Sequence, residues 1–409
     1  MKYLTILILT FLYTTICIAQ SDADLLNGVS ISRLQRYENW IRKEIQDQHI
    51  SGAATLIFRD TSVVYQKALG YQNIESQRAM KMNDIFAIQS MTKPIISVAI
   101  MILYEEGYFL LSDPVSKYLP QFENIRVIQD KNEGISGSTV PLTTPITIRH
   151  LLTHTAGFAS QGPSLLEKQI TSEINNKSYD NIEDRVSTMM QFPLIAQPGE
   201  AFIYGPSTDV LSVLIEYFSG MTTRDFLRKR IFEPLQMTDT DYNMPLEAST
   251  RFVPLHEIID GSLTVSSEQD PTSGNTVYRG VNGLFSTVSD YLHFSQMLLN
   301  KGYWRGQQIL GPKTIELMLA NHTDDLFPIL PGHYFGLGFA VTEDVGISQV
   351  TGTKGLYLWA GLYNTYFFID PREKLIAIFM TQSWPFSLYY LQKMKQLVYQ
   401  SLIISYSEK

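Results

Sequence analysis

The apolar run from Ile95 to Tyr104 (IISVAIMILY) constrains the fold more than any other stretch of the chain. Drawn as a helix, it carries apolar side chains on nearly every side, and such a helix is stable only where other elements surround it. The chain must therefore enclose it in a sizeable core, for which 409 residues and 44% hydrophobic content suffice. Ser90 stands just ahead of the run, so we expect it at the rigid, electropositive N-terminus of a buried helix.

Strand patterns occur near both ends of the chain, and helical patterns fill the middle. A charged helical pattern at residues 31–48 precedes two apolar strands, 53–58 and 63–71, which the Arg59–Asp60 turn joins as a hairpin. The C-terminal part contains three more strand patterns and a closing helix: 337–342, 363–369, 375–380 and 389–403. Distant parts of the chain therefore complete one sheet.

The domain organisation follows from this order of elements. A sheet built from both ends of a chain leaves the intervening helices as an insertion. We predict an α/β (α+β) fold with a sheet subdomain from about residues 28–85 and 300–409, and a helical subdomain at about 86–299. A signal peptide, residues 1–19, precedes this domain of residues 20–409.

The first residues have the pattern of an export signal. Lys2 gives a positive start, residues 4–16 are apolar, and the small residue Ala19 fits cleavage by signal peptidase after that position. The apolar run is shorter than the ~20 residues that a spanning helix needs, which disfavours a membrane anchor. We expect an exported protein, periplasmic or secreted, with no stable membrane insertion after cleavage.

Cys17 is the only cysteine of the chain, and it lies within the expected signal peptide. Lipid attachment at Cys17 stays open, although the bulky Ile16 before it makes a poor lipoprotein signal. After cleavage the mature chain has no thiol. This excludes disulfides, thiolate metal sites and a cysteine nucleophile.

Several other classes of function lack the residues that they need. The net charge of -8 comes without a basic cluster, so nucleic acid is not an expected partner. The chain has no Gly-x-Ser-x-Gly elbow and no His-Glu-x-x-His; His150 and His154 form the nearest histidine pair. Residues 336–338 (GLG) lack the third glycine of a nucleotide-binding loop. We expect neither a metal nor an organic cofactor.

Ser90 and Lys93 form the only Ser-x-x-Lys in the chain. Residues three apart share one face of a helix, so the hydroxyl and the amine come within hydrogen-bonding reach. A serine needs an adjacent base to become a nucleophile, and a lysine serves once burial lowers its pKa. The alternative is a helix N-cap followed by a solvated lysine. Pro94, which fits a first helical turn, and the buried helix after it favour the catalytic interpretation.

At this point the sequence resembles the β-lactamase-related serine hydrolases, the family of class C β-lactamases, D-alanyl-D-alanine carboxypeptidases and β-lactamase-fold carboxylesterases. The similarity runs from about Ile31 to about Trp384. It rests on five stretches: residues 86–93 (FAIQSMTK), 147–158 (TIRHLLTHTAGF), 197–200 (QPGE), 231–240 (IFEPLQMTDT) and 283–290 (GLFSTVSD). The resemblance implies a β-lactamase/transpeptidase-like fold, a mainly antiparallel sheet flanked by helices with an inserted helical domain. It also implies that His150 and His154 belong to the scaffold.

The second motif of this family begins with a tyrosine beside the serine, and Tyr204 occupies that place here. The resemblance implies that Tyr204 shares the base role as a phenolate or relays the proton to the leaving group. Family members often read Tyr-x-Asn, whereas this chain has Tyr204-Gly205-Pro206. The missing amide removes a common partner of a β-lactam side chain, which speaks against β-lactamase or peptidase activity.

The third family motif is often Lys-Thr-Gly on a strand that borders the site, and Trp359, Ala360 and Gly361 stand at this place. Trp-x-Gly resembles the carboxylesterase branch. A lysine there pairs with a substrate carboxylate, whereas an indole offers apolar area and one N–H donor, so neutral acyl substrates are favoured. Gly361 would let the substrate approach the strand, and the backbone N–H groups of Ser90 and Leu362 would form the oxyanion hole.

The sequence therefore favours an exported carboxylesterase that cleaves a small neutral ester or amide through an acyl-enzyme on Ser90. Three alternatives stay open. The first is a β-lactamase or D-amino-acid peptidase acting on cell-wall peptides, and the second is an acyltransferase that passes the acyl group to an alcohol. The third, of another class, is a binding protein that keeps the fold without turnover. Whether Lys93 or Tyr204 is the main base also stays open.

Overall fold

The computed structural model describes residues 24–267, 271–272 and 274–406. The predicted signal peptide and Cys17 lie outside these ranges. Within them, no helix is long and apolar enough to cross a membrane. The helices are α1 Ile31–Gln46, α2 Thr92–Glu105, α3 Ile148–Leu152, α4 Leu165–Asn175, α5 Ile182–Met189, α6 Ser207–Ser219, α7 Thr223–Leu227, α8 Val288–Leu299, α9 Pro312–Met318, α10 Val345–Ser348 and α11 Leu388–Tyr399.

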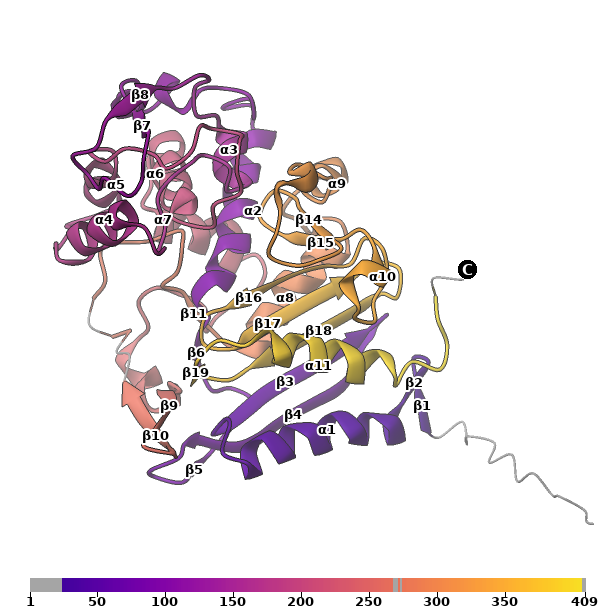
Figure 1. Cartoon of the computed structure of the whole chain (residues 1–409). Coiled ribbons are helices and arrows are strands. Elements are labelled where there is room, and N and C mark those ends of the chain that lie inside the picture. Colours follow the sequence, from indigo (N-terminus) through magenta and orange to yellow (C-terminus); the bar gives the residue numbers. More distant parts are fainter. Residues whose placement is uncertain (1–23, 268–270, 273, 407–409) are drawn as a thin grey trace, which may run out of the picture.

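An eight-stranded antiparallel sheet joins the two ends of the chain (Figure 1). Its strands, in spatial order, are β14 His333–Phe335, β15 Ala340–Thr342, β16 Tyr357–Gly361, β17 Thr365–Asp370, β18 Leu375–Met380, β3 Gly52–Arg59, β4 Ser62–Asn73 and β5 Arg78–Ala79. The predicted hairpin is β3–β4, and β18 pairs with β3 from Leu375↔Arg59 to Met380↔Ala54. The predicted antiparallel sheet built from both ends of the chain is confirmed.

Helices cover both faces of this sheet, which explains why β18 reads as an unbroken apolar run (LIAIFM). On one face, Trp40 of α1 and Tyr390 of α11 pack against Phe379, with ring centroids 5.7 and 6.1 Å away. On the other face, Tyr291 of α8 packs against Phe367 at 5.0 Å. The two faces alternate along each strand, so neighbouring residues of β18 serve different layers.

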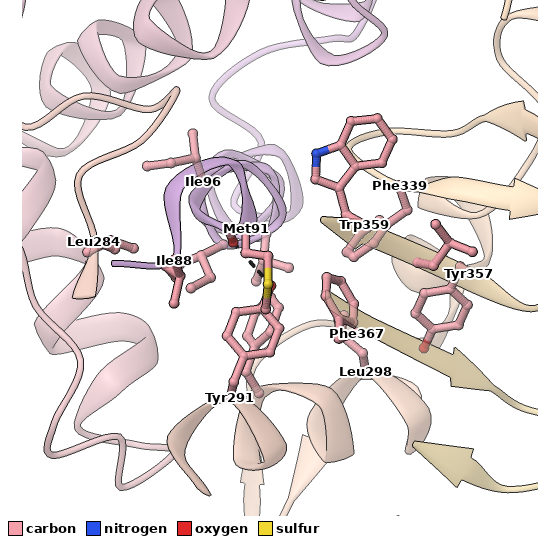
Figure 2. Packing of buried hydrophobic residues seen from close by; sticks show 14 of the residues in the cluster. Ile88, Met91, Ile96, Leu284, Tyr291, Leu298, Phe339, Tyr357, Trp359 and Phe367 are labelled. Atoms are coloured by element: carbon pink, nitrogen blue, oxygen red, sulfur yellow. Dashed lines mark hydrogen bonds between the residues drawn. The ribbon is translucent and has the colours of Figure 1, made fainter. Parts of the chain in front are cut away.

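The predicted buried helix is α2, which is enclosed from Thr92 to Leu103. It packs mainly against α6 in the helical part of the molecule. Figure 2 shows the start of α2 among side chains from the sheet and α8, including Trp359, Phe367 and Tyr291. The Tyr291 hydroxyl donates a hydrogen bond to the Met91 carbonyl over 3.1 Å, which ties the start of α2 to the sheet subdomain.

The helical subdomain ends earlier in the chain than the predicted boundary near residue 299. Helix α8 packs against β18, β3 and β17, so it belongs with the sheet. A three-stranded sheet also joins the predicted helical range to the C-terminal part of the chain. Its strands are β9 Leu255–Ile259, β10 Ser262–Ser267 and β19 Ser383–Trp384. Helical periodicity identifies an apolar face but does not say which layer that face covers, which is why the sequence placed α8 with the other helices.

Candidate active site

Ser90 lies in a short 3₁₀ turn from Gln89 to Met91 that runs directly into α2. Gln89 has a φ of 47°, in the left-handed region, which a non-glycine residue adopts at a cost of about 1–3 kcal/mol. The cap residue of α2 is Met91, and neither helix start has a side-chain cap bond. The N-cap alternative for Ser90 is therefore wrong, since its hydroxyl is free for other contacts.

Lys93 points its amine at Ser90, as the spacing on the helix predicts. Its Nζ donates to the Ser90 Oγ over 3.1 Å and to the Val281 carbonyl over 3.0 Å. Burial lowers the pKa of Lys93 to about 7, with Asp209 raising it and Arg279 lowering it further. Near neutral pH a substantial fraction of the amine is therefore unprotonated and can accept the proton of Ser90.

Tyr204 stands over Lys93 in the loop before α6. The Lys93 Nζ lies 4.4 Å from the centroid of the tyrosine ring, and the Trp359 indole N–H donates to the Tyr204 hydroxyl over 3.1 Å. Burial raises the pKa of Tyr204, although hydrogen bonds with Ser90 and Trp359 oppose the shift. The phenol thus stays protonated at neutral pH. This favours Lys93 as the base and Tyr204 as a neutral proton donor.

Trp359, in β16, is largely buried, and its ring packs against Tyr204 at 5.3 Å and Phe335 at 5.1 Å. Its single N–H is already used by Tyr204, so this residue offers the substrate only an apolar edge. Figure 2 shows the indole reaching from the strand towards the start of α2. Trp359 therefore orients Tyr204 as well as lining the site.

Replacing Trp359 by phenylalanine tests this orienting contact. The variant keeps an aromatic ring but leaves the Tyr204 hydroxyl without its donor, so we expect kcat/KM to fall by about tenfold, in line with the loss of one hydrogen bond. The measurement is ester turnover at fixed pH. Phe335→Leu, which removes a neighbouring ring without touching the Tyr204 hydroxyl, is the control. An unchanged kcat/KM in Trp359→Phe would show that the indole N–H has no role.

A cavity of about 240 Å³ opens beside Ser90 and Tyr204. The predicted residues Trp359, Ala360, Gly361 and Leu362 line it from β16 and the turn after it. The rest of the lining is apolar and was not found from the sequence: Ile329, Leu330, Leu358, Phe386, Leu388 and Leu391. Leu388 and Leu391 share a face of α11, which begins at Leu388, one residue before the predicted C-terminal helix of residues 389–403.

A wider groove of about 740 Å³ lies at the other end of α2, around Tyr108 and Phe109. No serine is among the described residues that line this groove, and Ser90 is not part of it. The smaller cavity, which contains the Ser90 hydroxyl and apolar walls, is the better candidate for substrate binding.

Gly361 has a packing role that the sequence did not predict. A Cβ at this position would lie 2.4 Å from the Ile88 carbonyl oxygen and 2.2 Å from Thr365 Oγ1. The missing side chain therefore lets the end of β16 approach the backbone just before Ser90. Gly361 still lines the cavity, but the close approach that it permits is between two parts of the protein.

The two histidines of the TIRHLLTHTAGF stretch are built into the scaffold. His150 accepts a hydrogen bond from the Thr147 N–H in the capping box of α3, and buried His154 packs 4.8 Å from the Tyr204 ring. Among the residues that the structure describes, no group of three histidine, cysteine or acidic side chains could hold a metal ion.

The described fold matches solved structures along nearly all of the chain. EstCE1, described as a hydrolase with promiscuous acyltransferase activity, superposes with a TM-score of 0.78 at 25% identity, covering 93% of this chain and 100% of that one. The fold is therefore that of the β-lactamase-fold hydrolases and acyltransferases. The Beta-lactamase family model matches residues 37–392, and the chain belongs to this family.

Two relatives of this chain are named as esterases. The lovastatin esterase of Penicillium rubens is 28% identical over 348 residues, covering 77% of this chain and 84% of that protein. Esterase EstB of Burkholderia gladioli is 24% identical over 368 residues, covering 83% of this chain and 88% of that protein. The resemblance inferred from the sequence motifs is confirmed at the level of the family and its fold.

Proposed function

We propose that this protein is an exported carboxylesterase that cleaves neutral esters with apolar groups through an acyl-enzyme on Ser90. The observation that carries the proposal is the Ser90–Lys93 pair, 3.1 Å apart, at the wall of an apolar cavity. The export step is supported by the sequence pattern of residues 1–19.

The proposed reaction is a double displacement. Ser90 Oγ attacks the acyl carbon while its proton moves to the Lys93 amine, and the N–H groups of Ser90 and Leu362 stabilise the oxyanion. The proton then passes from Lys93 through the Tyr204 hydroxyl to the departing alkoxide as the ester bond breaks. In the second half, water attacks the acyl-enzyme, gives up a proton by the same route and releases the acid together with the Ser90 hydroxyl.

The lining of the cavity supports a neutral substrate over an anionic one. Where many relatives of this fold have a lysine, Trp359 presents an indole whose N–H is bonded to Tyr204. The remaining walls are aliphatic or aromatic, so a carboxylate placed there would lose its hydration without gaining a cation. This disfavours the β-lactamase and D-amino-acid peptidase alternatives, whose substrates carry such a carboxylate.

Acyl transfer to an alcohol is the second candidate. It uses the same acyl-enzyme and differs only in the final acceptor. The apolar cavity favours it, since an alcohol with apolar groups could compete with water there, and the description of EstCE1 names promiscuous acyltransferase activity.

A matched pair of esters tests the proposed substrate class. We expect kcat/KM for a neutral short-chain ester to exceed that for its carboxylate-bearing analogue by about tenfold or more, because an unpaired buried charge is costly in the transition state. A cephalosporin serves as the third substrate. Preference for the anionic ester, or faster turnover of the cephalosporin, would contradict the proposal.

A further inference from the structure

The Val281 carbonyl is one of the two hydrogen-bond partners of the Lys93 amine, and nothing in the motifs points to it. We infer that Asp209 and Arg279 are positioning residues that hold this carbonyl in place and thereby keep Lys93 aimed at Ser90. The inference rests on the proposed function, because it concerns how the base of that reaction is set.

Asp209 lies in the first turn of α6 and is completely buried. Its Oδ1 accepts a hydrogen bond from the Val281 N–H over 3.0 Å. Its Oδ2 accepts from the Arg279 Nε and Nη2 over 3.2 and 3.1 Å, and from the Arg185 Nε over 3.3 Å. One carboxylate therefore holds both ends of the segment from Arg279 to Val281.

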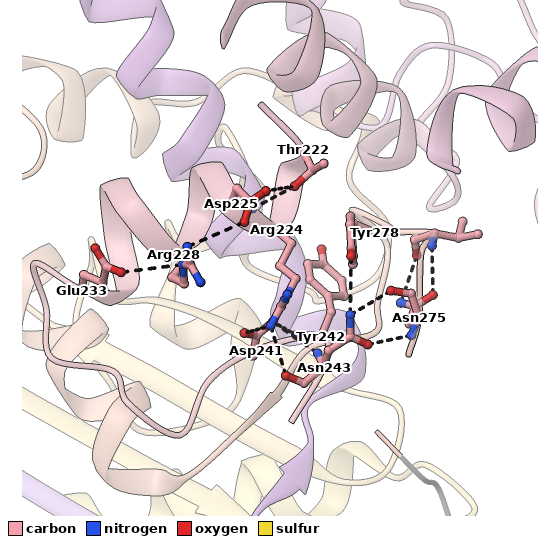
Figure 3. Close-up of polar contacts among 11 residues, drawn as sticks. Thr222, Arg224, Asp225, Arg228, Glu233, Asp241, Tyr242, Asn243, Asn275 and Tyr278 are labelled. Carbon is pink, nitrogen blue, oxygen red and sulfur yellow. Dashed lines mark hydrogen bonds and ion pairs between the residues drawn. The ribbon is translucent and has the colours of Figure 1, made fainter. Parts of the chain in front are cut away.

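The backbone of this segment is also fixed from other sides. A Cβ on Gly280 would lie 1.9 Å from the Thr208 carbonyl oxygen, so the chain presses directly against the start of α6. The Tyr242 hydroxyl donates to the Arg279 carbonyl over 2.6 Å. Figure 3 shows Tyr242 beside the Arg224–Asp241 ion pair. The Val281 carbonyl consequently has little freedom to move away from Lys93.

Asp209 and Arg279 also act on Lys93 through their charges, which shift the pKa of its amine. Besides Ser90, the polar and titratable groups that face Lys93 are Tyr204, His154, Asp209 and Arg279. The Asp209 carboxylate favours the protonated amine, and Arg279 opposes it. A bare buried carboxylate here would hold Lys93 as an ammonium ion, which cannot accept a proton. Arg279, which is paired with the same carboxylate, opposes this effect on Lys93 while Asp209 holds the segment.

Variants of Asp209 and Arg279 should therefore move the acidic limb of the pH profile of kcat/KM in opposite directions. Arg279→Gln exposes Lys93 to the carboxylate and raises the pKa of the amine, so we expect the limb to move to higher pH by about one unit. Asp209→Asn keeps the side-chain size and the acceptor for Val281 but removes the negative charge, so the limb should move to lower pH by a similar amount. Arg279→Lys retains the cation and should keep the limb near its original place.

The readouts are the pH dependence of kcat/KM for a neutral ester and of the labelling rate with a fluorophosphonate. Arg251→Gln, which breaks a partly buried ion pair with Asp239, is the matched control and should not move the limb. If both Asp209→Asn and Arg279→Gln fold and leave the limb in place, whether or not activity falls, the cluster does not set Lys93 and the inference is overturned. Failure of the unaltered protein to be labelled would instead refute the proposed function.

Discussion

Replacing Ser90 by alanine should abolish covalent labelling by fluorophosphonates and lower ester turnover by about four orders of magnitude or more, because the reaction loses its attacking group. The fold should survive. The Ser90 hydroxyl does not cap the helix that follows, so the variant loses only its contacts with Lys93 and Tyr204, at a cost of about 1 kcal/mol in the free energy of unfolding.

Intact-mass spectrometry after labelling gives the direct measurement, and thermal unfolding checks the fold. Ser97, in the helix that follows Ser90, provides a matched control, since it is fully buried and its hydroxyl has no hydrogen-bond partner among the described residues. Ser97→Ala should keep both labelling and turnover. Labelling that persists in Ser90→Ala would place the nucleophile elsewhere.

The local parts of this site could be predicted from the sequence, because helical spacing alone fixes them. Ser90 and Lys93 are three residues apart where the 3₁₀ turn runs into α2, and their 3.1 Å contact follows from that spacing and from burial of the apolar run. Burial also lowers the pKa of Lys93, as expected for a lysine in the first turn of a fully enclosed helix.

Contacts between distant segments could not be predicted from the residues themselves. Tyr204 and Trp359 are 155 residues apart, and only the family resemblance brought them to one site. The sequence indicated that the indole offers one N–H donor, and the fold directs that donor to the Tyr204 hydroxyl. The Val281 carbonyl carries no side-chain signal, since a backbone oxygen is the same at every residue. It becomes a partner of Lys93 only through the fold.

The shape of the cavity was likewise beyond the sequence. Phe386 lies between β19 and α11, Leu388 is the first residue of α11, and both line the cavity with Ser90. The path of the chain from β19 to α11 depends on loop conformation, which periodicity does not encode. The substrate class depends on this lining, and the paired esters test it directly.

Replacing Lys93 by arginine should be nearly as damaging as replacing it by methionine, with kcat/KM falling by about three orders of magnitude or more in each. The arginine keeps the positive charge, but a guanidinium does not lose its proton near neutral pH and so cannot act as the base. Methionine matches the length of the lysine side chain without its amine. Because Lys93 is almost fully buried, thermal unfolding must show that both variants are folded before their rates are compared.

The pH profile of the unaltered protein distinguishes the two candidate bases. Lys93 must be unprotonated to act, and its pKa is lowered to about 7, so kcat/KM should be low in acid and rise as the pH passes through about 7. Burial raises the pKa of Tyr204, so a tyrosinate base would place that rise far into the alkaline range. An arginine variant that keeps most of its activity, with a profile rising only in alkali, would make Lys93 a fixed charge and Tyr204 the base. A rise near neutral pH that disappears together with activity in both Lys93 variants identifies the amine as the group that accepts the proton of Ser90.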